Sequence, residues 1–311
     1  PMQFARRQGY AISKRRKLHA MKEINAYCDS FVLGSDQLWN PGLSKPYGHS
    51  YFLDFAAPDR KRIAYGTSFG KGTHVIDEVY KNRSRFELSK FDAISVRDDF
   101  SKRLIEDEYG RHAVKVLDPA LLCDASEFRK LADQAEEPSC VAGDMPRLSD
   151  EPYLFAYILD PKDDTLDDLA DIAGKAGLPV VVSLDMAPSS VERNRALFSG
   201  GEQRRVFALD RPHVEQWLYA IANASATLTD SFHGMLFSFA FGKNFAAFPN
   251  AQRGAGRFTD VASVLGLEDR LVDGLHGNTG KVCMLLETDI DYRSASRRLE
   301  EERAFSRRWL H

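Results

Sequence analysis

The sequence lacks the features that mark several large classes of protein. Its four cysteines are scattered over 311 residues without a CxxC pair, so reduced thiols of a cytosolic protein are predicted, with no disulfide framework or zinc site. No apolar run approaches the roughly 20 residues that a membrane span needs, and no secretory signal is visible. The net charge of −3 argues against a general nucleic-acid-binding protein. Motifs of zinc proteases, P-loop proteins and serine hydrolases are also missing.

What is present is the pattern of an α/β protein. The composition, 43% hydrophobic and 28% charged, is typical of a globular protein, and the length suffices for two domains. Short apolar strands alternate with charged helical segments, which predicts parallel sheets with helices on both faces. Strands are expected at 31–33, 62–65, 93–96 and 114–117, and again at 153–158, 179–183, 205–209, 226–228 and 245–248. Helices are expected at 75–91, 98–109, 164–176, 211–224 (with Asp210 as its N-cap) and 234–242.

The same pattern divides the chain. Residues 1–135 are predicted to form a first Rossmann-like domain. The stretch 136–152 is aperiodic and rich in Pro, Asp and Glu, and it is predicted to be an interdomain linker. Residues 153–287 repeat the alternation as a second Rossmann-like domain, and 288–311 form a charged terminal helix that packs back on the first. The opening shows no strand pattern for about 30 residues, so we expect a first βα segment to be absent.

Polar residues cluster directly after the predicted strands. The run TDSFHG (229–234) lies between an apolar strand and an apolar helix, and helix N-termini at strand ends are where α/β folds bind anions. His233 there can move a proton near neutral pH, although a lone histidine is more often structural. Four other strand-end motifs share this placement and are expected to converge at one sheet edge: Gly34-Ser35-Asp36-Gln37, Gly66-Thr67-Ser68-Phe69-Gly70, Arg97-Asp98-Asp99 and Gly254-Ala255-Gly256-Arg257.

Two other groups of charged residues allow more than one interpretation. Acidic residues near these motifs could bind a metal, but turn and capping roles are the favoured interpretation, and no metal site is predicted. These acidic residues are Asp36, Asp98, Asp99 and Asp230. The basic cluster 14–17 is either a solvated helix face or a contact with an anionic surface such as a membrane or a glycan.

At these motifs the chain resembles the polysaccharide pyruvyl transferase family. The resemblance covers nearly the whole chain in order, and only the family's opening strand and glycine-bearing loop have no counterpart. The matching segments are VLGSDQLWNP (32–41), YFLDF (51–55), KRIAYGTSFG (61–70), AISVRDD (93–99), VLDPALL (116–122), TDSFHGMLFSFAFGKNF (229–245) and RFTDVASVLGLEDR (257–270).

The resemblance implies a GT-B-like fold, with two Rossmann-like domains facing a central cleft. It also implies transfer of a pyruvate ketal from phosphoenolpyruvate to a sugar of a cell-surface polysaccharide or its lipid-linked precursor, with no metal or organic cofactor required. The enzyme would be cytoplasmic, with a peripheral position at the inner membrane face and homo-oligomerisation left open. His233 would be the general acid, and the donor would be bound by Arg97, Ser231, Ser68 and Arg257. The cleft would be lined by Ser35, Asp36, Gln37, Asp230 and Gly234.

One departure from the family pattern stands out. Ketal-forming relatives read Arg-Leu-His where this chain reads Ser231-Phe232-His233, so the missing charge would have to come from Arg257 or Arg253. Two alternatives therefore stay open. The protein could be a GT-B glycosyltransferase that uses a nucleotide sugar, or a non-catalytic glycan-binding relative.

Overall fold

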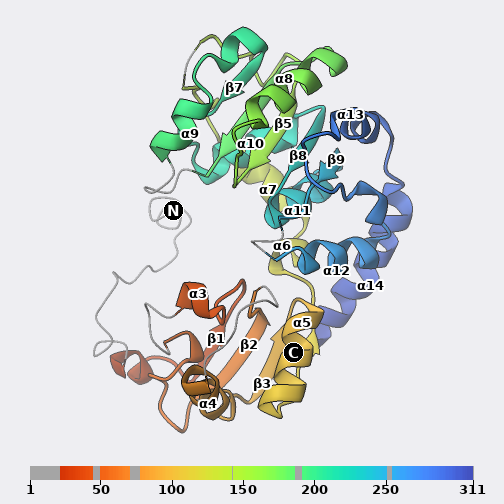
Figure 1. Cartoon of the computed structure of the whole chain (residues 1–311). Helices are drawn as coiled ribbons and strands as arrows, with labels where there is room; N and C mark the ends of the chain where they lie inside the picture. Colours follow the sequence, from red (N-terminus) through yellow and green to blue (C-terminus); the bar gives the residue numbers. More distant parts are fainter. Residues whose placement is uncertain are drawn as a thin grey trace. The chain divides into compact units, whose positions relative to one another are not determined.

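A computed structural model describes residues 22–44, 50–70, 78–141, 143–185, 191–250 and 254–310 (Figure 1). The chain divides into two compact units. The carboxy-terminal unit comprises Cys123–Asn250 and Val261–Leu299. The amino-terminal unit consists of the described residues of Met2–Leu122, Ala251–Asp260 and Glu300–His311. The chain therefore passes from one unit to the other within helices α12 (Gly256–Leu265) and α14 (Tyr292–Leu310).

The amino-terminal unit is built on a four-stranded parallel sheet. Its strands follow one another in chain order, β1 (Ser30–Leu33), β2 (Lys61–Thr67), β3 (Ala93–Val96) and β4 (Val114–Lys115). Its other elements are η1 (Lys22–Ala26), α3 (Pro41–Ser44), η3 (Ser50–Phe52), α4 (Glu78–Leu88), α5 (Asp99–Arg103), the π-helical η4 (Leu104–Glu108) and α6 (Pro119–Leu122).

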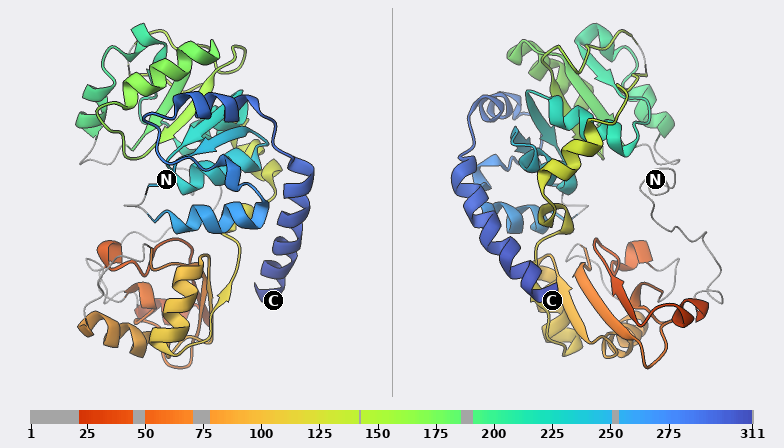
Figure 2. Two further views of the ribbon diagram at one scale, coloured as in Figure 1. Left: turned by 45° about the vertical axis from the view of Figure 1, so that its right-hand side comes forward. Right: turned by 180° about the vertical axis from the view of Figure 1, so that it is seen from behind.

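The carboxy-terminal unit is built on a parallel sheet (Figures 1 and 2). The sheet has five strands in the order β7-β6-β5-β8-β9. Its strands are β5 (Leu154–Ile158), β6 (Val180–Leu184), β7 (Val206–Ala208), β8 (Ala226–Thr229) and β9 (Asn244–Ala247). The strand order reverses between β5 and β8, and α/β sheets bind ligands at the carboxyl ends of the strands beside such a reversal. The other elements are α7 (Ala125–Ala132), α8 (Thr165–Ala176), α9 (Val191–Leu197), η5 (Gly201–Arg204), α10 (Val214–Asn223), α11 (Phe232–Ala240), η7 (Glu268–Arg270) and α13 (Thr279–Glu287).

Both faces of this second sheet are buried, as a parallel sheet requires. Alternate residues of β5 point to opposite sides, so Leu154 and Ile158 join one hydrophobic cluster and Phe155 joins another. The core of the amino-terminal unit is aromatic. Trp39 is fully buried and stacks on Phe52 with ring centroids 5.6 Å apart. The α/β class and the parallel sheets predicted from the sequence are confirmed.

The predicted boundary between the domains falls too late in the chain. Helix α7, which was assigned to the first domain, belongs to the carboxy-terminal unit and packs on α10. The stretch 136–152 is also part of that unit rather than a linker, apart from residue 142, which lies outside the described residues. The backbone of Cys140 forms an isolated antiparallel β-bridge with Leu209. The Leu148 side chain lies in the core and is 1% exposed. Buried apolar residues and backbone hydrogen bonds attach a segment to a domain despite a loop-like composition.

Two helix starts also differ from the sequence-based expectation. The N-cap of α10 is His213, which forms a capping box with Gln216, whereas the Asp210 carboxylate pairs with Arg195. Helix α11 begins at Phe232, two residues before the predicted start. The last part of α14 belongs to the amino-terminal unit, where the Ser306 hydroxyl accepts a hydrogen bond from the Leu117 amide at 3.0 Å. Among the described residues no helix is both long and apolar enough to span a membrane.

Candidate active site

The TDSFHG run forms the junction between β8 and α11. Ser231 is the N-cap of α11, and its hydroxyl accepts a hydrogen bond from the Gly234 amide at 3.3 Å. The Ser231 amide in turn donates to the Thr229 hydroxyl at 2.9 Å. With 4% of its surface exposed, Ser231 closes the first turn of the helix, which is the ordinary task of a serine at this position.

Gly234 is required by the packing of this junction. A Cβ atom at this position would lie 2.3 Å from the Thr229 hydroxyl oxygen and 3.0 Å from the Thr229 Cβ. The first turn of α11 therefore rests directly on the end of β8. The backbone hydrogen-bond donors of that turn are held beside the strand end, in the position where a helix N-terminus favours an anion.

Asp230 has a structural task at the same edge of the sheet. It is 5% exposed, and its two carboxylate oxygens accept hydrogen bonds from the amides of Leu159 at 2.7 Å and Asp160 at 2.9 Å. The Asn250 side-chain amide donates to the Asp160 carboxylate at 2.6 Å. The loops that leave β5, β8 and β9 are thus fastened to one another at the strand-order reversal, which gives His233 an ordered surrounding.

His233 is half-buried in the first turn of α11. Its ring meets the Phe232 ring edge-on, with centroids 5.5 Å apart. The structure therefore places an imidazole at a helix N-terminus beside the reversal of strand order, where α/β proteins bind ligands. Such a group can transfer a proton to or from a bound anion.

The amino-terminal unit carries the second group of predicted residues. Arg97 follows β3, and its guanidinium, with 1% of the side chain exposed, pairs with the carboxylates of Asp118 and Asp36. Asp118 is 3% exposed, whereas the Asp36 side chain is 54% exposed. Because two carboxylates bind the Arg97 guanidinium, Arg97 positions Asp36 at the sheet edge; it is not presented to solvent as an open anion site.

Arg257 lies in the first turn of α12 and belongs to the same unit. Its side chain is 10% exposed, and its guanidinium lies 3.9 Å from the Asp36 carboxylate. Burial, followed by the charge of Arg97, lowers the pKa of Arg257 to about 10, while Asp36 and Asp98 act in the opposite direction. Burial and the neighbouring guanidinium of Arg97 make the charge of Arg257 costly, and a bound carboxylate or phosphate would offset that cost.

The remaining predicted residues of this unit shape the turns around Asp36. Ser68 is fully buried, and its hydroxyl accepts a hydrogen bond from the Gly70 amide at 2.9 Å. Gln37 accepts from the Asn40 side-chain amide at 2.8 Å. Ser35 is half-buried in the turn after β1. These contacts assign Ser68 and Gln37 to turn formation, whereas the sequence had suggested donor binding for Ser68.

Sequence reasoning did not single out Asp118 as a site residue, although a carboxylate directly after an apolar strand was the available signal. Asp98 caps α5 through the Ser101 amide at 2.8 Å, and its other carboxylate oxygen is buried without a hydrogen-bond partner in the described part of the chain. The basic cluster 14–17 and Arg253 lie outside the described residues. The structure thus gathers the predicted residues into two groups, one in each unit.

The fold and these strand-end groups define the class of protein. Among solved structures, the UDP-GlcNAc 2-epimerase of Methanocaldococcus jannaschii, in complex with UDP-GlcNAc and UDP, is similar with a TM-score of 0.56 at 11% identity, over 96% of this chain and 86% of that chain. The UDP-GlcNAc 2-epimerase of Neisseria meningitidis is similar with a TM-score of 0.53 at 11% identity, over 98% of this chain and 82% of that chain. At this identity the likeness shows the fold alone, which is of the GT-B type.

The family is shown by the sequence itself. Residues 3–252 match the model of the polysaccharide pyruvyl transferase family, and the chain belongs to that family. The resemblance drawn from the motifs is therefore confirmed. A search of curated proteins found no match.

Proposed function

We propose that the protein transfers a pyruvyl group from phosphoenolpyruvate to a sugar of a cell-surface polysaccharide or its lipid-linked precursor, in the cytoplasm. The single observation that supports this best is the half-buried His233 at the start of α11, in a chain of the pyruvyl transferase family. Phosphoenolpyruvate offers a carboxylate and a phosphate, and these groups call for guanidinium and helix N-terminal donors.

In the proposed reaction, protonated His233 donates its proton to the methylene carbon of phosphoenolpyruvate. The enol carbon becomes an oxocarbenium-like centre, and one sugar hydroxyl attacks it and loses a proton. The phosphate then leaves, and a second hydroxyl attacks the same carbon to close the ketal and loses its proton. His233 acts as a general acid in the first step, and the proposed reaction uses no metal or organic cofactor.

In this proposal Arg257, rather than Arg97, binds the donor anion. Arg97 is paired with two carboxylates and is 1% exposed, whereas Arg257 is 10% exposed and 3.9 Å from Asp36. Arg97 is then a positioning residue, which acts through Asp36. This assignment reverses the order of importance that the sequence suggested for the two arginines.

A second candidate is a GT-B glycosyltransferase that uses a nucleotide sugar. The observation in its favour is Ser231, which stands where ketal-forming relatives carry an arginine, and the two epimerases similar in fold were solved with UDP-GlcNAc bound. A non-catalytic glycan-binding relative would also share the fold.

Thermal unfolding in the presence of candidate donors separates these functions, because a ligand that binds the native state raises the midpoint. We expect phosphoenolpyruvate to raise it and UDP-sugars to leave it unchanged. Arg257→Met should abolish the shift, and Arg85→Met, an exposed arginine of the same unit, should retain it. A shift with a UDP-sugar and none with phosphoenolpyruvate would refute the proposed function. A phosphoenolpyruvate shift that survives in Arg257→Met would refute only the role of Arg257.

A further inference from the structure

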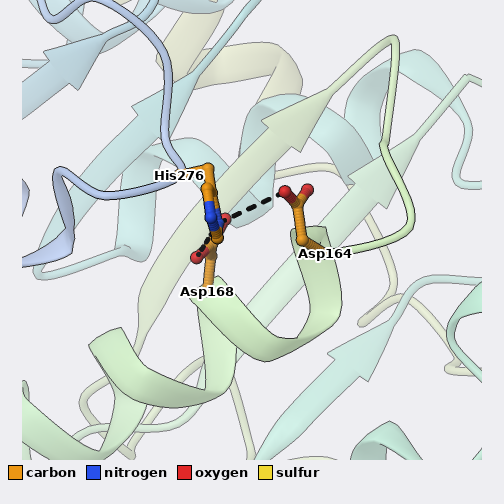
Figure 3. Close-up of side chains that lie close together, drawn as sticks. All are labelled: Asp164, Asp168 and His276. Atoms are coloured by element: carbon orange, nitrogen blue, oxygen red, sulfur yellow. Dashed lines mark hydrogen bonds and ion pairs between the residues drawn. The ribbon is translucent and has the colours of Figure 1, made fainter.

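A cluster of three metal-ligand side chains lies in the carboxy-terminal unit, and the proposed reaction does not use it. Asp164 immediately precedes α8, Asp168 follows one turn later, and His276 comes from the loop between η7 and α13. Residues four apart share one face of a helix, so both carboxylates face the histidine (Figure 3).

The two distances from His276 to the carboxylates are those that one shared metal ion imposes. The His276 Nδ1 is 3.2 Å from an Asp164 oxygen and 3.2 Å from an Asp168 oxygen, and all three atoms are within 4.8 Å of one another. Ligands at about 2.1 Å from one ion, seen from it at 90–110°, are roughly 3.0–3.4 Å apart. Both distances from His276 therefore fit one shared ion.

Charge and burial point the same way. The Asp168 side chain is 11% exposed, so its carboxylate is largely withdrawn from water and lies beside the carboxylate of Asp164. A histidinium offsets only one of the two facing carboxylate charges, whereas a divalent ion with neutral imidazole offsets both. His276 is 72% exposed, so the ion has a path from solvent and water can complete its coordination.

We propose that Asp164, Asp168 and His276 bind a divalent transition-metal ion of the Zn²⁺ type. One imidazole nitrogen with two carboxylate oxygens suits first-row divalent ions. The ion would join the start of α8 to the segment before α13. These two helices are already connected further along, where Lys175 and Asp171 of α8 both hydrogen-bond the Thr279 hydroxyl. Its effect would therefore be to stabilise the carboxy-terminal unit, independently of the proposed pyruvyl transfer.

The test is calorimetric titration of the full chain with Zn²⁺, repeated with Co²⁺ as a visible-absorption probe. We expect one equivalent to bind the wild type, with affinity reduced at least tenfold in Asp168→Asn and in His276→Ala. The matched control is Asp167→Asn, which changes the charge equally one residue away, at a side chain 70% exposed, and it should bind like the wild type.

Cysteines and other histidines of the chain can also bind these metals, so the difference between variants decides the outcome. His276→Ala alters an exposed side chain and should fold normally. Equal affinity and an equal Co²⁺ spectrum in the wild type and His276→Ala would overturn the proposal, and so would the absence of Zn²⁺ binding to the wild type. In that case His276 only makes polar contacts with the two carboxylates.

Discussion

The pairing of Arg97 with two unequally exposed carboxylates allows a quantitative prediction. Asp118→Asn keeps the shape of the side chain but removes the charge that faces Arg97 in the interior. Asp118 and Arg97 are 3% and 1% exposed at their side chains, and breaking a buried pair from one side costs about 3–5 kcal/mol. Arg97 keeps Asp36, so we expect a loss of about 2–4 kcal/mol in the free energy of unfolding.

Asp36→Asn is the matched control, because it removes the other carboxylate of the same guanidinium. The Asp36 side chain is 54% exposed, and a pair open to solvent contributes about 0–1 kcal/mol. The ratio between the two variants, rather than either value alone, tests whether the buried partner holds Arg97.

The assay must follow the amino-terminal unit separately, since a chain of two units need not unfold in one step. Hydrogen exchange of the β3 amides (Ala93–Val96) reports the opening of that unit. Thermal unfolding should also show a midpoint lowered by about 7–13 °C in Asp118→Asn. If Asp36→Asn destabilises the unit as much as Asp118→Asn does, the assignment of Arg97 as a residue held by Asp118 is wrong.

Two further predictions concern the junction of β8 and α11. His233→Ala should lower pyruvyl transfer by about 10²–10⁴-fold while leaving the unfolding midpoint unchanged, measured as phosphate release from phosphoenolpyruvate with acceptor present; near-wild-type turnover would exclude His233 as the general acid. Gly234→Ala should destabilise the carboxy-terminal unit by about 1–3 kcal/mol, because its Cβ would lie 2.3 Å from the Thr229 hydroxyl. Gly174→Ala, with no atom within 4 Å of its Cβ, is the control and should leave stability equal or higher in urea unfolding.

The alternation of strands and helices could be predicted because it depends on local patterns. The strands of the carboxy-terminal unit read as mainly apolar runs bounded by turn residues, and all four residues of β8 are buried because both faces of the sheet are covered. The placement of TDSFHG at the end of a strand followed from the same pattern. This position is a candidate ligand site because the strand order reverses between β5 and β8. That reversal is a property of the whole sheet, and no single strand encodes it.

The partners of the charged residues could not be predicted, because they are distant in the chain. Arg97 meets Asp36 across 61 positions and Asp118 across 21, so its motif suggested a free cation where the fold supplies two counter-charges. The cluster of Asp168 and His276 spans 108 positions. The prediction of a linker at 136–152 was wrong for a related reason, because the burial of Leu148 depends on a sheet formed later in the chain.

The structure explains why a serine occupies position 231 of the TDSFHG run. Ser231 is 4% exposed and caps α11, and an arginine there would forfeit a cap worth about 1 kcal/mol. It would also need room for a guanidinium in a place that packs a helix onto a strand. Under the proposed function, the anion-binding charge must then come from another residue. Arg257 meets that need better than Arg97, because its guanidinium lies 3.9 Å from the Asp36 carboxylate, whereas Arg97 makes close ion pairs with both Asp36 and Asp118. Burial also makes the charge of Arg257 costly in the absence of an anion.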